Sequence, residues 1–136
     1  MVEVEYLHLC DYAFPGEGGK PCIIGIFESI LGQQFPLTHQ QMYIAVQFKG
    51  TPHERFSLRL ELGRPNGDVL AGMDVPQQLY LSEHGTAFVN AALNNVVFPE
   101  HGRYTVKVIS GGRTLHTRSV QLIRGQQGPV PAPTAH

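Results

Sequence analysis

The sequence predicts an all-β domain, specifically a two-sheet antiparallel β-sandwich of immunoglobulin-like type. Short runs with an apolar residue at every second position recur at spacings of about 8 to 12 residues, and Gly, Pro and Asn turns separate them. The clearest run, Phe56 to Leu62, alternates as a strand with one buried face requires. Tyr104 opens the penultimate predicted strand, where a tyrosine ties the corner between the sheets of immunoglobulin-like domains. No segment of the sequence has a convincing helical period, so a sandwich is favoured.

The first half of the chain predicts three strands. The first covers residues 2–13, and a shift of its apolar phase near Tyr6 and Leu7 predicts a bulge or a change of packing partner. Residues 22–27 are almost continuously apolar, which favours a central strand, and Gly25 indicates a bulge or a close backbone approach within it. The third strand covers residues 42–48. We expect its alternate apolar side chains to share one face: Met42, Ile44, Val46 and Phe48.

The second half predicts further strands joined by hairpin turns. They cover residues 56–62, 69–73, 79–81, 86–93, 104–108 and 114–123. Asn66 and Gly67 turn the first of these hairpins, because Asn-Gly readily supplies positive φ at both central positions. Gly111 and Gly112 turn the last one, and a change of apolar phase predicts a bulge near Thr117.

The domain organisation follows from length and composition. A chain of 136 residues suits one domain with its own core, which we assign to residues 1–124. Residues 125–136 are dominated by Gln, Pro, Ala and Gly, and we expect them to form a disordered tail.

Charge and hydropathy limit the partners and the compartment. The net charge of -1 provides no field that would attract phosphate backbones or anionic lipids, so we expect neither nucleic acid nor membrane as a partner. Glu3 and Glu5 stand where a secretory signal carries positive charge, and no stretch approaches the roughly 18 apolar residues of a membrane span. We therefore expect a cytoplasmic protein with reduced thiols, although Cys10 and Cys22 flank a Gly-rich turn and a disulfide across a hairpin stays open.

Five pieces of the sequence carry a resemblance. They are Leu9-Cys10-Asp11-Tyr12-Ala13, Gly18-Gly19-Lys20, Ile24-Gly25-Ile26-Phe27, Phe35-Pro36 with Thr38-His39, and Val97 to Tyr104. Together they resemble an uncharacterised family of small bacterial β-sandwich proteins of unknown function, over residues 7–122. The resemblance implies the sandwich fold and a bacterial origin, and it brings no known activity, cofactor or catalytic residue.

A metal or thiol site is one hypothesis for the function. His8 and Cys10 lie two apart on one predicted strand, and Cys22 could face them from the next, which gives three ligands of the type that zinc accepts. The alternative is that the cysteines are small apolar core residues. A Cys–His pair for thiol catalysis can also be drawn. The remaining candidate histidines lie in predicted turns, where solvated side chains are expected: His39, His53, His84 and His101.

Protein binding is the leading hypothesis. The low charged fraction, 15%, and aromatic residues in Pro-containing loops suit a weakly charged interface with aromatic anchors. The candidate binding residues lie in the loops around residues 14–20 and 35–39: Phe14, Glu17, Lys20, Phe35 and His39. The alternative for both phenylalanines is that they cover the ends of the core.

We therefore expect a non-enzymatic module without a cofactor that binds another protein or a second copy of itself. An exposed edge of the final strand is one route to a second copy. The alternatives are a small metal-dependent or thiol enzyme centred on His8, Cys10 and Cys22, and a module that binds carbohydrate or another small ligand on a sheet face. The absence of Trp makes an aromatic sugar platform less favourable.

Overall fold

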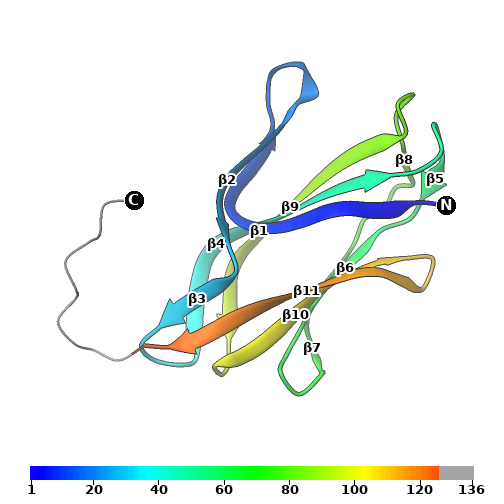
Figure 1. The fold of residues 1–136 in the computed structure, drawn as a ribbon. Helices are drawn as coiled ribbons and strands as arrows, with labels where there is room; N and C mark the ends of the chain where they lie inside the picture. Colours follow the sequence, from blue (N-terminus) through cyan, green and yellow to red (C-terminus); the bar gives the residue numbers. More distant parts are fainter. Residues whose placement is uncertain (126–136) are drawn as a thin grey trace.

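Two β-sheets packed face to face make up the fold. It is described for residues 1–125 by a computed structural model (Figure 1), so the predicted tail lies outside the described residues except for Gly125. In chain order the strands are β1 (Glu3–Pro15), β2 (Pro21–Phe27), β3 (Ser29–Gly32), β4 (Leu37–Lys49), β5 (Arg55–Phe56), β6 (Arg59–Gly63), β7 (Val69–Asp74), β8 (Leu79–Tyr80), β9 (Thr86–Phe98), β10 (Gly102–Ser110) and β11 (Arg113–Arg124). The single turn of 3-10 helix, η1 (Glu17–Gly19), is the one helical element in this part of the chain, so no helix described there is long and apolar enough to cross a membrane.

The strand order confirms the predicted immunoglobulin-like sandwich. Sheet A has the order β2-β1-β4-β9, and sheet B has the order β3-β11-β10-β6-β7. Strands β1, β4 and β9 take the positions of strands A, B and E of an immunoglobulin domain, while β6, β10 and β11 take those of C, F and G. Neighbouring strands are antiparallel except β3, which runs parallel to β11. Strands β5 and β8 form a short separate ladder.

The core lies between the sheets and follows the predicted alternation. The apolar face of β4 is buried, with Met42, Ile44, Val46 and Phe48 at most 2% exposed. From sheet B, Tyr104, Val106 and Val108 face them at 0% exposure. Tyr104 forms the expected corner, because its hydroxyl donates to the Glu100 carbonyl oxygen at 2.7 Å and accepts from the Glu100 amide at 3.2 Å. These contacts fix the approach of β10 to the core.

The strand predicted to be central, residues 22–27, is an edge strand. As β2 it pairs with β1 alone within sheet A, and Ile24 and Ile26 are 56% and 52% exposed. The predicted close approach at Gly25 is correct. Gly25 has a φ of +71°, and any larger side chain there would overlap the Asp11 carboxylate. An apolar run alone does not distinguish a strand buried on both faces from an edge strand with exposed apolar side chains.

Other expectations differ in detail. The bulge in the first strand lies between Val4 and Tyr6, as predicted, whereas the last hairpin has its irregularity at Leu115 rather than at Thr117. The turn after β6 is longer than an Asn-Gly two-residue turn, because the Arg64 amide bonds to the Asp68 carbonyl oxygen at 2.7 Å and only Gly67 of the pair has positive φ. The run 56–62 is broken between β5 and β6.

Candidate interaction surfaces

The β1–β2 hairpin, residues 12–24, forms an arm that crosses the outer face of sheet A. Strand β1 pairs with β4 up to the Cys10–Tyr43 pair and then leaves it, while it stays paired with β2. The bend falls at Asp11 and Gly25. Gly25 has a positive φ, which glycine adopts without strain. The arm therefore starts where these two residues face each other.

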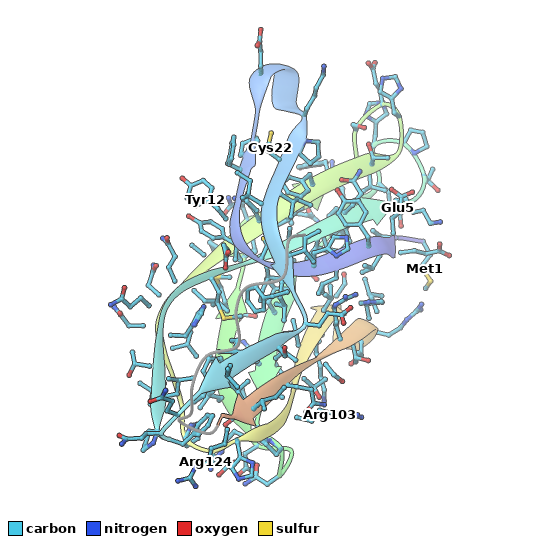
Figure 2. The ribbon with its side chains drawn as sticks, turned by 60° about the vertical axis from the view of Figure 1, so that its left-hand side comes forward. Met1, Glu5, Tyr12, Cys22, Arg103 and Arg124 are labelled. Carbon is cyan, nitrogen blue, oxygen red and sulfur yellow. The ribbon has the colours of Figure 1, made fainter. Side chains whose placement is uncertain are left out.

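The arm is held down by a small apolar cluster and one hydrogen bond. Ala13 and Ile23 pack over Ala45 and Phe88, which lie on β4 and β9. The Asn90 side-chain amide of β9 donates to the Ala13 carbonyl oxygen at 2.7 Å. Because Asn90 lies two strands away from β1, this bond shows that the arm spans β4 completely. Beyond it the tip projects past β9, as Figures 1 and 2 both show.

The three metal candidates do not come together. His8 and Cys10 share the outer face of β1, as predicted, because Leu7 and Leu9 face the core. Cys22 pairs with Phe14 whereas Cys10 pairs with Ile26, so the two cysteines are four positions, or about 14 Å, apart along the hairpin. Both are free thiols. Within residues 1–125, no group of three or more His, Cys, Asp or Glu side chains is placed to hold a metal ion.

The Cys10 thiol lies in surroundings that suppress its ionisation. Its side chain is 0% exposed, and the thiol points to the Tyr43 carbonyl oxygen at 3.7 Å. Burial raises the pKa of this thiol and outweighs a backbone hydrogen bond at Tyr12 that lowers it, while the Asp11 carboxylate raises it slightly further. Burial likewise lowers the pKa of His8, with a smaller contribution from the Arg118 guanidinium. The raised pKa of Cys10 disfavours the thiolate, which is the form that attacks an electrophile or binds a metal.

The five candidate binding residues lie in two separate places. Phe14, Glu17 and Lys20 are on the arm, where Glu17 and Lys20 are exposed and the Phe14 ring lies 5.4 Å from that of Tyr12. Figure 1 shows the β3–β4 loop, which carries Phe35, at the other end of the molecule. The two predicted loops therefore do not form one surface.

The candidate side chains around the β3–β4 loop pack against the core and do not form an exposed binding surface. Phe35 is partly buried against the core, and its ring lies 6.0 Å from that of His101. His39 lies within β4 instead of a turn, 6.1 Å from the Phe27 ring, and its Nε2 atom is buried without a hydrogen-bond partner. The position of Phe35 therefore agrees with the alternative hypothesis, in which this side chain covers the end of the core.

Exposed apolar side chains gather along the margin formed by β2 and β3, which are the edge strands of the two sheets and follow one another in the chain. We call this set the edge strip; Ile26 (52% exposed), Leu31 (69%) and Ile123 (47%) lie on the margin itself, and Tyr12 (44%) and Ile24 (56%), the first pair of the arm, adjoin it where the arm turns over β4. Tyr12 pairs with Ile24 across the hairpin, and Ile123 pairs with Leu31 across β11 and β3. Sequence reasoning missed the strip, because it assigned residues 22–27 to the interior. Pro21 and Gly25, which are more frequent at edges, were the available signal.

Comparison with known proteins shows a family and a fold. A model described as "Family of unknown function (DUF6941)" matches residues 5–123. No curated protein matches. Among solved structures, the C-terminal domain of wzt is similar with a TM-score of 0.56 at 11% identity, covering 99% of this chain and 84% of that one.

Two other solved structures are similar. The alkylpurine DNA glycosylase AlkC of Pseudomonas fluorescens, bound to DNA containing an abasic site analog, has a TM-score of 0.55 at 12% identity, and the match covers 89% of this chain and 30% of the glycosylase. An immunoglobulin-like protein of Pseudomonas aeruginosa matches with a TM-score of 0.47 at 15% identity, over 90% of this chain and 97% of that one. At such identities the first two likenesses show the sandwich fold alone.

Proposed function

We propose that this protein, which belongs to the family of unknown function (DUF6941) matched over residues 5–123, is a non-catalytic module that binds another protein through the edge strip. The observation that supports the proposal most is the clustering of the strip. Five of the nine large apolar side chains exposed in the described part of the chain lie either on this margin or on the first pair of the arm beside it. Contiguous exposed apolar surface on a soluble domain is typical of interaction sites.

The chemistry of the margin suits a protein partner. Covering the exposed part of one isoleucine contributes on the order of 1 kcal/mol, because about half of each side chain is already buried. The free edges of β2 and β3 add unpaired backbone groups that an extended segment of a partner can bond. Beside the strip, Glu28 and Arg118 form an ion pair at 3.4 Å, which provides a polar rim.

The non-catalytic part of the proposal draws support from the Cys10 thiol. A nucleophilic cysteine requires access and a lowered pKa. Cys10 has neither, because it is buried and its pKa is raised. As part of the same proposal we assign the protein to the cytoplasm, where two separate free thiols persist as such.

The test is partner capture with two matched double variants. Ile26→Lys with Leu31→Lys places charges on the strip, while Val69→Lys with Tyr80→Lys makes the same change at two side chains that are equally exposed elsewhere, 54% and 55%. Tagged proteins are used as bait in a lysate of the source cells, and bound proteins are identified by mass spectrometry. We expect a partner to be lost from the strip variant and retained by the control, with far-UV circular dichroism unchanged in both. Equal capture by both variants would contradict the proposal.

A further inference from the structure

The opposite margin of sheet A carries a second free edge, strand β9. Among residues 1–125 it is hydrogen-bonded along one side only, to β4, from Thr86 to Phe98 with a break at Asn95. Its other side therefore presents unpaired backbone amide and carbonyl groups, which are a template for another strand. A groove of about 380 Å³, lined in part by Leu70, Leu93 and Val96, opens beside it toward β7.

Strand β9 lacks two of the features that usually block pairing at an edge, charged residues and proline, and has an irregularity only near its end, at Asn95. None of its 13 residues is charged, and none is proline. The other edges are less suitable: β2 contains Pro21 and Gly25, β3 has 4 residues, and β7 has 6 and ends at Asp74. An uncharged strand can also pair with a copy of itself without bringing like charges together.

The position of the arm favours a second copy as the occupant. Antiparallel self-pairing of β9 brings Ala92, the middle residue, opposite its own symmetry mate, with residue 90 facing residue 94. Each arm crosses its own β9 beside Phe88 and Asn90. The two arms then lie about 20 Å apart on either side of the axis, so they do not collide.

In such a dimer, the tip of each arm would also contact the partner. The tip extends past β9 (Figure 2) and would lie over the end of the partner's strand, where Val97 is 48% exposed. Asn95, with a φ of 54°, limits the regular ladder to residues 90–94 of each copy. The arms therefore add contact where backbone pairing ends.

We propose that two copies of this chain associate through antiparallel β9–β9 pairing centred on Ala92, with each arm laid over the partner's sheet A. This interface is on the margin opposite the edge strip, and it stands independently of the proposed function.

A charge-swap experiment tests this pairing. Ala92 is exposed, so Ala92→Lys and Ala92→Glu are compatible with the fold, and each places two like charges opposite one another at the axis. By native mass spectrometry we expect a wild-type dimer, a dimer at least about tenfold weaker in each single variant, and a mixed dimer of intermediate mass when the two variants are combined. Restoration in the mixture shows that neither variant is misfolded. Val69→Lys on β7 is the matched control and should remain dimeric.

Hydrogen exchange provides the backbone readout. Amides within residues 90–94 should become more protected as protein concentration rises in the wild type and not in Ala92→Lys. A wild-type chain that is monomeric at high micromolar concentration would overturn the proposal. A dimer that persists in Ala92→Lys would also overturn it. If the dimer were lost in the edge-strip variant instead, the interface would lie on the β2–β3 margin and the proposal would be wrong.

Discussion

Tyr104 fastens the corner at which the chain enters β10. Its buried hydroxyl bonds to both the carbonyl oxygen and the amide of Glu100. Tyr104→Phe keeps the ring and removes both bonds, which should lower the free energy of unfolding by about 1–3 kcal/mol. Urea denaturation measures the change, and Tyr80→Phe, at a side chain 55% exposed, is the control. Equal losses in the two variants would contradict a role for the corner.

Cys10 should make stability depend on alkaline pH. Burial raises its pKa above the ordinary value of 9.0, so the unfolded chain releases this proton first as pH rises. Its contribution is therefore complete below pH 9.0 and is lost as pH increases through the higher pKa of the folded state. Between about pH 8 and pH 10, Cys10→Ala should lose less unfolding free energy than the wild type. Cys22→Ala is the control, and identical pH slopes in Cys10→Ala and wild type would refute the expectation.

At the level of elements, sequence pattern predicted strands well and their neighbours poorly. The alternation in residues 42–48 and 104–108 gave the buried faces correctly, because a half-buried strand has an unambiguous period. Strand β2 failed for the opposite reason. Its run has no alternation, and whether Ile24 and Ile26 are covered depends on which strand lies beside them, which is a property of the whole sheet.

The arm depends on a bend that Gly25 makes possible. Gly25→Ala imposes a positive φ on alanine and pushes its Cβ into the Asp11 carboxylate, whereas Gly18→Ala at the same φ of +71° meets nothing within 4 Å. We expect the Gly18 variant to lose about 1–2 kcal/mol and the Gly25 variant more than that. Denaturant unfolding gives both values, and hydrogen exchange over residues 12–24 should rise mainly in Gly25→Ala.

The second variant of this pair separates strain from overlap. Asp11→Ala in the Gly25→Ala background removes the overlapping carboxylate and should recover the excess loss, leaving the cost seen at Gly18. Equal costs for the two single glycine variants would show that the Asp11 contact has no part in setting the bend.

For the molecule as a whole, the candidate interaction surfaces could not be predicted from the sequence, because they depend on which strands pair and in which register. Glu17 and Lys20 lie in the predicted loop, whereas Phe14 lies within β1. Nothing in the sequence shows that the hairpin crosses β4, so that Ala13 meets Asn90, 77 positions away. The edge strip likewise unites Leu31 with Ile123 through a parallel pairing of the chain's third and last strands. Such non-local contacts carry no short-range signal.

The two sheets share one core, and this should make unfolding cooperative over residues 1–125. Met42 on sheet A and Leu60 on sheet B belong to the same buried cluster, at 0% and 3% exposure. Met42→Ala or Leu60→Ala should each remove about 2–5 kcal/mol of unfolding free energy. Because neither sheet can keep its inner face covered alone, each variant should destabilise the most protected amides of β4 and of β10 equally, as native-state hydrogen exchange measures. A Met42→Ala variant that weakens β4 while leaving β10 unchanged would instead establish that the sheets unfold separately.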